Sequence, residues 1–573
     1  MMAAALFIVL AAAKAATLAG HWPPQSGWAP PAYLWHDAAL VGMFALLEHR
    51  CRRRPQFVAV VYAIGALYVV ITIPVVRVLG TPLTLPMWRA AGGALADSIV
   101  YYVTPANLAS IGGLLITAFA APSLTRRATP LLAASIAIPV AILGSIGASR
   151  VDTHGLERNA WSALALSALP RVAAESTASS TDWRAPLADV ADATDLSWLR
   201  GAAADRNVIL VALESTAAQY LGLYGATPDI SPNLTRLAQS AVVFDRAYAV
   251  YPESIKGLFA TLCSRYPAFD RPARDYAGVS CRSPAAILGE HGYRTGLFHA
   301  GRFEYLGMNA VIRDRGYDLL ADAGDIGGNR ESSFGVDEPA VVDFMLRWID
   351  RLQPGKRFFM TYLPIAGHHP YESSRGAAAN PFPKDNEFDR YRNAIHDGDE
   401  ALGALIDGVR QRGLAKQTMW IVYGDHGEAF GQHAGNYGHT FQLYEENVHI
   451  PFLVSLPETL AQPVRSDRVV SLIDTAPTLL DLAGIAPPAD YQGRTALRGK
   501  PAMSLFFADY SLGLLGLRDG PNKFVYEMES GRARFFDLVR DPNETHNLYA
   551  ERSAAQAEYT RRLTQWIKTA TGG

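Results

Sequence analysis

Two stretches of the chain place carboxylate and imidazole side chains directly after apolar runs. Residues 207–213 lead to Glu214, and residues 421–424 lead to Asp425 and His426. Buried parallel strands have such continuous apolar runs, and they bring side chains to the carboxyl edge of a sheet. Oxygen and imidazole ligands without cysteine suit a divalent ion, which acts as a Lewis acid on a phosphoryl or sulfuryl oxygen. We therefore predict a metal site for zinc, manganese or calcium.

Two further strand-like runs end in the same way. Residues 357–363 lead to His368, and residues 294–298 lead to His299 and Arg302. If all four runs are parallel strands of one sheet, their carboxyl ends meet at one edge. We expect the four strands to converge on one pocket.

The chain has 573 residues, which predicts at least two domains. Residues 1–150 are poor in charge and predict a membrane anchor, whereas the remainder has the composition of a water-soluble protein. A helix needs roughly 20 apolar residues to cross a bilayer. Five apolar stretches approach this length, so we predict five transmembrane helices, at about 2–19, 32–48, 57–79, 105–122 and 129–147. Lys14, His36 and Asp37 lie in or beside these stretches, and we expect them to reach the membrane interfaces.

Charge and cysteine usage predict the orientation of this anchor. Positive charge gathers after the second stretch and between the fourth and fifth, at Arg50, Arg52, Arg53, Arg54, Arg126 and Arg127. Because positively charged loops stay in the cytoplasm, we place both loops there and everything after about 150 outside. Cys263 and Cys281 then fall where oxidation is permitted, and we predict a disulfide between them, the alternative being two buried thiols. The net charge of −2 is uninformative, and the basic residues are too dispersed to support a nucleic-acid partner.

The exported part divides into a linker and a catalytic domain. Residues 151–205 are rich in Ala, Ser, Thr and Asp and predict a linker. From 206 to 570, strands alternate with helical patterns such as 389–412, and Ser231 with Pro232 is a helix-start signal. This alternation predicts an α/β sandwich around a mostly parallel sheet. After about 515 we expect short antiparallel strands and a final helix over about 552–569.

The ordered motifs of residues 206–550 resemble the sulfatase family of the alkaline-phosphatase superfamily. These motifs are the strand ending in Glu214, Gly424-Asp425-His426-Gly427-Glu428 with Gly438-His439, Leu443-Tyr444-Glu445-Glu446, Ile473-Asp474 with Pro477 and Thr478, and Phe536-Asp537-Leu538 with Asp541-Pro542. The resemblance implies an alkaline-phosphatase-like sandwich with a small C-terminal antiparallel sheet, preceded here by an all-α transmembrane domain. The anchor in front of such a domain is similar to lipoteichoic-acid synthases and phosphoethanolamine transferases of the bacterial envelope.

By position, the resemblance implies roles for several residues. Glu214, Asp425 and His426 would bind the metal together with Ser254, the nucleophile, and His368 and His439 would contact the transferred group or a second metal. A metal that holds Ser254 as alkoxide would activate its otherwise poor hydroxyl nucleophile. Transition-state charge would then be stabilised by Lys256, Arg302 or His368.

Each of these roles has an alternative. Glu214 can instead cap a helix, and Lys256 and Arg302 can pair with acidic neighbours. Ser264, Thr261 and Ser240 compete with Ser254 as nucleophile.

One departure from the family concerns the nucleophile motif. Typical sulfatases carry Cys or Ser, any residue, Pro, any residue and Arg, and oxidise the first residue to formylglycine. Ser254-Ile-Lys256-Gly-Leu lacks both Pro and Arg. An unmodified serine must have its ester attacked at the central atom, which suits phosphorus better than sulfur.

These observations predict a metal-dependent enzyme in the bacterial cytoplasmic membrane that cleaves a sulfate or phosphate ester on the outer side. An envelope lipid or glycan would be the substrate, and membrane lipids would surround the anchor. The alternatives are a phosphoethanolamine or glycerophosphate transferase and, in another class, a non-catalytic scaffold with the same fold.

Overall fold

The computed structural model describes residues 1–19, 26–90, 102–169, 171, 182–189, 194–328, 335–372, 381–383, 385–549 and 553–570. The chain forms two compact units. The N-terminal unit comprises Met1–Arg171 with the short segments Gly431–Phe441 and Tyr510–Leu512, and the second unit comprises the rest.

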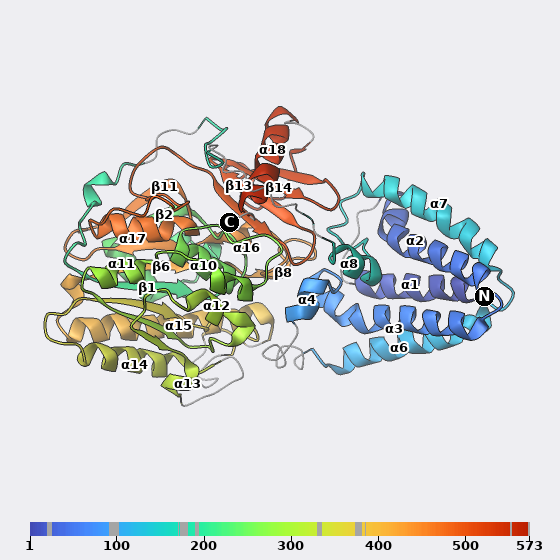
Figure 1. Cartoon of the computed structure of the whole chain (residues 1–573), viewed down its shortest axis with the longest axis horizontal. Helices are drawn as coiled ribbons and strands as arrows, with labels where there is room; N and C mark the ends of the chain where they lie inside the picture. Colours follow the sequence, from blue (N-terminus) through green and yellow to red (C-terminus); the bar gives the residue numbers. More distant parts are fainter. Residues whose placement is uncertain are drawn as a thin grey trace. The chain divides into compact units, whose positions relative to one another are not determined.

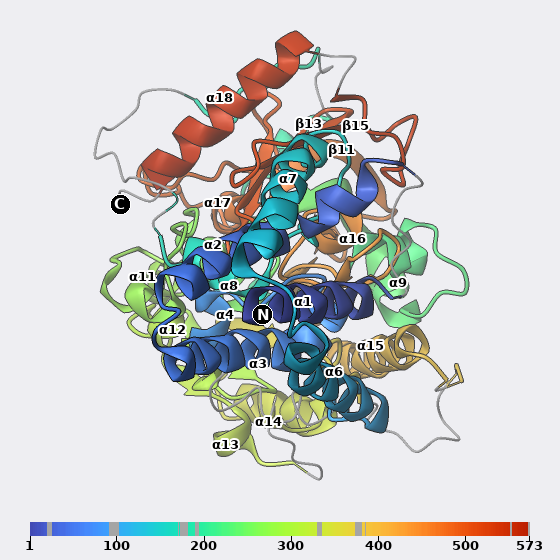
Figure 2. The same cartoon turned by 90° about the vertical axis from the view of Figure 1, so that its right-hand side faces the viewer.

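The N-terminal unit is helical (Figure 2). Its helices are α1 (Met2–Leu18), α2 (Ala29–Arg50), α3 (Pro55–Leu79), α4 (Leu85–Ala90), α6 (Pro105–Leu124), α7 (Pro130–Ala148) and α8 (Ala160–Leu166), and the strand β8 (Tyr437–Gly438) belongs to its inserted segment. Three of the described helices, α3, α6 and α7, are long and apolar enough to cross a membrane. The predicted count of five spans is therefore wrong: helices do form at all five stretches, but α1 has only 17 residues and α2 carries His36, Asp37 and Glu48.

Lys14 and Asp37 also differ from the expectation that they reach the membrane interfaces. Both are buried within the helical unit, and Lys14 Nζ lies 3.3 Å from Asp37 Oδ2. Lys14 Nζ donates to the carbonyl of Leu156 at 2.8 Å, and Asn159 donates to Asp37. A buried charge is tolerated where a partner and hydrogen bonds satisfy it, and here other helices and loops of the unit supply them.

The second unit is built on a nine-stranded sheet (Figure 1). The strand order is β11-β2-β10-β6-β1-β5-β3-β4, and β9 pairs with β2. Only β10 and β9 run antiparallel to their neighbours. The strands are β1 (Asn207–Leu213), β2 (Ala241–Tyr248), β3 (Arg294–His299), β4 (Leu319–Ala321), β5 (Phe358–Leu363), β6 (Thr418–Gly424), β9 (His449–Ile450), β10 (Phe452–Ser455) and β11 (Val464–Ser471), with β7 (Ala429–Phe430) outside this sheet.

Helices cover both faces of this sheet (Figure 1). On one face, α9 (Pro232–Leu237), α14 (Glu338–Asp350) and α15 (Glu387–Gln411) share a buried apolar core with strand residues such as Ile209 and Val422. On the other lie α10 (Ser254–Cys263), α11 (Pro284–Glu290) and α17 (Thr475–Leu482), and shorter helices complete the unit: α12 (Asn309–Ile312), α13 (Ala323–Ile326) and α16 (Glu445–Val448). The predicted α/β sandwich around a mostly parallel sheet is confirmed.

The C-terminal part also follows the prediction. Four antiparallel strands, β12 (Ser504–Ala508), β13 (Leu514–Asp519), β14 (Asn522–Glu527) and β15 (Ala533–Asp537), form a separate sheet. Helix α18 (Ser553–Ala570) follows. The helix turns its Tyr559 toward this sheet, where the Tyr559 hydroxyl donates to Asp519 at 2.7 Å.

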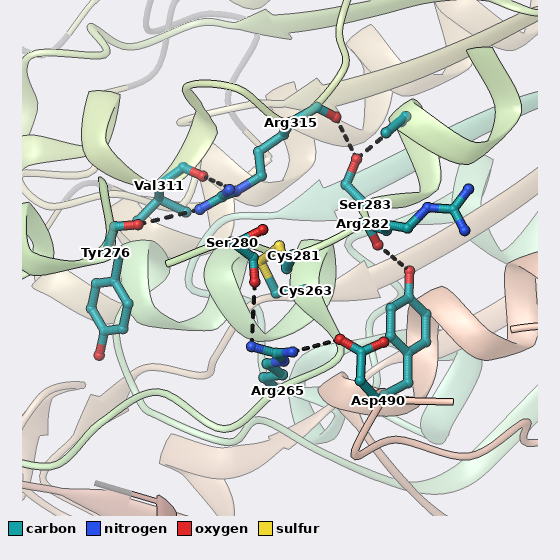
Figure 3. Close-up of a disulfide and its surroundings, with 12 residues drawn as sticks. Cys263, Arg265, Tyr276, Ser280, Cys281, Arg282, Ser283, Val311, Arg315 and Asp490 are labelled. Carbon is teal, nitrogen blue, oxygen red and sulfur yellow. Dashed lines mark hydrogen bonds and ion pairs between the residues drawn. A yellow bond between two sulfur atoms is a disulfide. The ribbon is translucent and has the colours of Figure 1, made fainter. Parts of the chain in front are cut away.

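Cys263 and Cys281 form the predicted disulfide (Figure 3). Cys263 ends α10, the helix that begins at Ser254. Beside the disulfide, Arg265 donates to the carbonyl of Ser280 at 3.3 Å and pairs with Asp490. The covalent bond therefore holds the far end of the helix that carries the predicted nucleophile.

Candidate active site

The two strands with the clearest sequence signal lie next to each other. β1 and β6 are parallel and in register, with Leu213 opposite Gly424. The residues that follow this pair are Glu214 and Asp425, and the Asp425 amide donates to the Leu213 carbonyl at 3.1 Å. The register of the two parallel strands therefore brings the two carboxylates to one place. Asp425 Oδ1 also accepts a hydrogen bond from the Ser215 amide at 2.9 Å, although 210 residues separate the two in the sequence.

Two glycines allow the turn after β6 to pack closely. A Cβ at Gly424 would lie 2.4 Å from the carbonyl oxygen of Thr216, and one at Gly427 would lie 2.1 Å from that of Glu446. Both distances are far too short for a side chain, so only glycine fits. This explains why Asp425 and His426 are enclosed by glycines.

Glu214, Asp425 and His426 form a compact, buried set of ligand atoms. One atom from each lies within 4.8 Å of the others. His426 Nε2 is 3.8 Å from Glu214 Oε1 and 3.6 Å from Asp425 Oδ2, and all three side chains are less than a tenth exposed. Two buried carboxylates repel each other unless a cation lies between them. The donor set of two carboxylates and one imidazole therefore fits a divalent metal ion.

Ser254 completes this arrangement. It is the first residue of α10, whose start is capped by the Glu253 side chain accepting from the amides of Ile255 and Lys256. Its Oγ lies 3.0 and 3.2 Å from the Glu214 carboxylate oxygens and 3.2 Å from His426 Nε2. The hydroxyl thus points at the same centre as the three candidate ligands.

The competing nucleophiles have other contacts. Ser264 lies at the opposite end of α10, and its hydroxyl donates to the Ile473 carbonyl at 2.7 Å. The hydroxyl of Ser240 lies 3.1 Å from that of Ser455 on β10, and Thr261 is buried within α10. Of the four candidates, Ser254 is the one that the structure brings to the carboxylates.

Lys256 is held by an acidic neighbour. Its Nζ lies 2.8 and 3.0 Å from the carboxylate oxygens of Asp509, and both side chains are buried. The ammonium also lies 4.2 Å from the centre of the Tyr251 ring, and the Tyr251 hydroxyl donates to the same Asp509. This is the pairing that the sequence left open as the alternative, and a role in charge stabilisation stays a prediction.

Three further predicted residues are His368, Arg302 and His439. His368 follows β5, and its ring meets that of Tyr305 edge-on at 5.9 Å. The Arg302 guanidinium lies beside Gly324 of α13, 3.6 Å from where a Cβ would stand. His439 lies in Gly431–Phe441, which belongs to the N-terminal unit. Their roles stay predictions.

His299 ends β3 inside the core rather than in an open pocket. It is buried, its Nδ1 lies 3.0 Å from the Leu363 carbonyl, and it stacks on Phe303. Burial lowers the pKa of His299 to about 4, so the ring is neutral at pH 7. The four predicted strands do lie side by side as β6-β1-β5-β3.

Tyr305 is a candidate functional residue that the sequence did not reveal. Burial, with smaller contributions from the negative charges of Glu214 and Glu253, raises its pKa. Its ring meets that of His368, the predicted site residue that follows β5, edge-on. A tyrosine in an irregular segment has no periodicity or spacing that marks it, so its position is evident only in three dimensions.

Several known proteins are similar to this chain. Residues 206–485 match the family model described as Sulfatase. Lipoteichoic acid synthase-like YvgJ of Bacillus subtilis is 24% identical over 316 residues, covering 52% of this chain and 51% of the relative. The arylsulfatase of Clostridium perfringens is 26% identical over 185 residues, covering 30% of this chain and 38% of that protein. The chain thus spans about half the length, or less, of these curated relatives.

Solved structures share the fold of the second unit. BT4656, in complex with its substrate D-glucosamine-2-N,6-O-disulfate, superposes with a TM-score of 0.52 at 17% identity and covers 64% of this chain and 98% of that one. Ps i-CgsB, in complex with k-i-k-neocarrahexaose, gives a TM-score of 0.51 at 18% identity over 64% of this chain and 94% of that one. At this level of identity the likeness supports the fold alone.

Proposed function

We propose that this chain, whose residues 206–485 belong to the sulfatase family of the alkaline-phosphatase superfamily, is a metal-dependent enzyme that cleaves a sulfate or phosphate ester through Ser254. The observation that carries the proposal is the position of the Ser254 hydroxyl, within 3.2 Å of both Glu214 oxygens and of His426 Nε2. Glu214, Asp425, His426 and Ser254 would hold the ion. When bound, the ion supplies Lewis-acid chemistry that favours the alkoxide form of a serine.

The hydrogen bonds of His426 define which nitrogen faces the nucleophile. His426 Nδ1 lies 2.9 Å from the Gly427 carbonyl, which can only accept, so in the neutral ring Nδ1 carries the proton. Nε2 therefore presents its lone pair toward Ser254 Oγ. This lone pair can take part in metal binding or accept the serine proton as Oγ attacks the central atom of the ester.

Ester cleavage then proceeds in two steps. Ser254 Oγ forms a bond to sulfur or phosphorus, and the bond from that atom to the substrate oxygen breaks. The substrate oxygen leaves with the electron pair and takes up a proton, either the one that His426 received from Ser254 or one from water. The covalent intermediate is resolved by attack of water, which gives hydrolysis, or of a second alcohol, which gives group transfer. The departure of Ser254-Ile-Lys256 from the formylglycine motif favours attack on phosphorus.

The transferase alternative has one specific support. The match to lipoteichoic acid synthase-like YvgJ extends over 316 residues, more than the match to the arylsulfatase of Clostridium perfringens. Transfer of a glycerophosphate or phosphoethanolamine group to an envelope lipid or glycan would use the same Ser254 intermediate. A non-catalytic scaffold is disfavoured, because the three candidate ligands and the hydroxyl are all present and gathered together.

We also propose that the N-terminal helices anchor the enzyme in the bacterial cytoplasmic membrane, with residues 206–570 on its outer side. The boundary between the two units, after Arg171, falls inside the predicted linker 151–205. An anchor of three membrane-spanning helices gives the same orientation as the predicted anchor of five. Arg52, Arg53 and Arg54 precede α3, and Arg126 and Arg127 lie between α6 and α7, so the positive-inside rule leads α3 outward, α6 inward and α7 outward. The Cys263–Cys281 disulfide fits an oxidising compartment.

The decisive experiment assays the purified full chain with an aryl sulfate, a phosphate monoester and a phosphodiester, with and without chelator. Ser254→Ala is compared with Ser240→Ala, a serine of the same unit that pairs with Ser455 instead. We expect activity toward at least one ester that is lost on chelation and in Ser254→Ala and retained in Ser240→Ala. Activity that survives both chelation and Ser254→Ala would refute the mechanism.

The topology is tested with a membrane-impermeant thiol reagent on intact cells. Cys51 lies between α2 and α3 and is the free cysteine of the described residues. We expect Cys51 to remain unlabelled and Cys263 and Cys281 to label only after reduction. Labelling of Cys51 in intact cells would reverse the orientation.

A further inference from the structure

The second unit contains a cavity of about 220 Å³ that shares no residue with the candidate active site. Its charged lining residues are Arg184, Arg468, Asp474, Arg494, Arg498 and Lys500. Arg184 lies in the predicted linker, and the others come from β11, from the turn that follows β11 and from the loop before β12. Within the described part of the chain, five cationic side chains and one carboxylate therefore line a single hollow.

The carboxylate of this lining is already neutralised. Arg184 binds Asp474 with two parallel hydrogen bonds of 2.6 and 2.7 Å. Asp474 also accepts from the amides of Arg494 at 2.8 Å and Ser471 at 2.9 Å. A bidentate arginine pair with two further amide donors satisfies the carboxylate oxygens, so Asp474 adds little negative potential to the cavity.

Two other lining arginines have carboxylate partners outside the cavity lining. Arg498 pairs with Asp481 at 3.1 Å, and Arg494 pairs with Asp182. Asp195 also acts on Arg468 through its negative charge, so four carboxylates, those of Asp182, Asp195, Asp474 and Asp481, face the five cations of the lining. The cavity therefore keeps an excess of positive charge.

The cationic groups differ in how firmly they are held. Arg468 is buried, at 7% exposed, and its Nη1 donates to the carbonyl of Gly499 at 3.0 Å. Lys500 is exposed and lines the same cavity. Gly499 has φ +94, and no atom lies within 4 Å of where its Cβ would stand. A buried guanidinium, an exposed ammonium and open space beside a glycine give a small anion both donors and room.

We propose that this cavity binds a tetrahedral oxyanion, a phosphate or sulfate group, either free or carried on an ester. A guanidinium fork matches two oxygens of such a group, and partial burial strengthens the attraction because water screens it less. The site is separate from the metal centre and would hold its anion in a chain without metal or nucleophile.

The test measures anion binding to the full chain in neutral detergent, with chelator present and in the Ser254→Ala background, so that neither metal nor turnover contributes. The probes are inorganic phosphate and inorganic sulfate, compared with glucose 6-phosphate and glucose 6-sulfate. We expect calorimetric binding that raises the thermal midpoint. Binding of the inorganic ions identifies a site for the free anion, and binding of the esters alone identifies a site for a group carried by a larger molecule.

Variants then assign the binding to this cavity. Arg468→Gln and Lys500→Gln should each weaken binding about tenfold, because each removes one charge-assisted contact. The control Arg412→Gln removes the same charge from α15, where Arg412 pairs with Asp350, and should change binding less than twofold. Lys500 is exposed, so its variant should fold even if Arg468→Gln does not. Binding that is absent with every probe, or unchanged in Lys500→Gln and in folded Arg468→Gln, would overturn the proposal.

The anion-binding test is done without metal and without the Ser254 hydroxyl. Its result therefore does not depend on whether the proposed ester cleavage is correct. Loss of anion binding would likewise say nothing against Ser254 as nucleophile. The two proposals can therefore fail independently.

Discussion

The second unit contains two buried clusters of acidic side chains that differ in what lies between the carboxylates. In the first, Glu214 and Asp425 converge on His426 and the Ser254 hydroxyl. In the second, Lys523 Nζ lies between two carboxylates, 3.0 Å from Glu445 and 2.9 Å from Glu544.

The electrostatics of the second cluster are those of a structural bridge. Lys523 is fully buried, and the Glu445 amide donates to Glu544, so the cluster joins α16 to β14 and the loop after β15. Burial disfavours ionisation of Glu445, but the positive charges of Lys523, His449 and Arg518 together outweigh it and lower the pKa of that carboxyl. Comparison of the two clusters teaches that buried acids alone do not indicate a metal: the chain neutralises one set itself, whereas the other has the spacing of a ligand set.

The largest expected effect comes from removing a candidate ligand. Asp425→Asn should lower activity at least about a hundredfold. Even the loss of a residue that only hydrogen-bonds to a metal ligand lowers metal affinity or activity by about 10–100-fold. It should also abolish the rise in thermal midpoint on adding metal. The checks are steady-state assays, metal analysis and thermal unfolding.

Asp350→Asn is the matched control for that variant, because Asp350 is exposed and pairs with Arg412 far from the strand ends. We expect it to keep both activity and metal stabilisation. If added metal raised the thermal midpoint of Asp425→Asn as much as that of the unchanged protein, the first cluster would not be the metal site.

The structural cluster should respond in the opposite way. Lys523→Met leaves two buried carboxylates without their ammonium and should destabilise the fold by about 3–5 kcal/mol. The change in denaturant midpoint measures this, and metal binding by the remaining folded protein should be unaltered. The exposed pair of Lys416 and Glu458 supplies the control Lys416→Met, which should leave the midpoint unchanged. If Lys523→Met kept the denaturant midpoint of the unchanged protein but no longer bound metal, the second cluster and not the first would be the metal site.

The disulfide offers a third perturbation, outside both clusters. Cys263→Ser with Cys281→Ser opens a loop with a sequence separation of 18 and should reduce the free energy of unfolding by about 3 kcal/mol. Chemical denaturation of the double variant measures the loss, with Cys51→Ser as control because Cys51 is a free cysteine. Metal affinity should persist in the folded double variant. Its disappearance would show that the cross-link positions α10 for metal binding.

The smallest expected effect is a pH dependence of stability from Glu338, a buried carboxyl beside β5. Burial raises the pKa of Glu338 from 4.5 to about 7. The folded state therefore binds more protons than the unfolded state between these values, and stability falls as pH rises from about 4.5 to 7. Glu338→Gln keeps the acceptor for the Ile365 amide and cannot ionise, so it should reduce this fall by roughly 2 kcal/mol. Unfolding curves at pH 5 and pH 8 for both proteins provide the test, and identical slopes would contradict it.

Local signals predicted the elements but not their partners. Ser231 and Pro232 correctly located the start of α9, yet the Ser231 side chain makes no capping hydrogen bond. The amides of Asn233 and Leu234 donate instead to Asp399 on α15, both at 2.8 Å. A carboxylate 165 residues away in the chain supplies the cap, which a pattern confined to neighbouring residues cannot indicate.

The membrane-like region shows the same limit. Hydrophobicity located helices at all five stretches, but it predicted that Lys14 and Asp37 would reach water. Packing places them together inside the helical unit at 3.3 Å. Apolar composition is a property of a window of residues, whereas pairing of two charges depends on which helices become neighbours.

The sequence by itself determined the sheet, the disulfide and the proximity of Glu214 to Asp425 and His426. It could do so because apolar runs specify strands, and parallel strands in register bring the residues after them to one edge. Tertiary structure decided that Lys256 turns toward Asp509, that Tyr305 meets the His368 ring, and that five cations line one cavity. Those side chains come from loops and separate elements, whose meeting depends on packing of the whole unit and leaves no periodic trace in the chain.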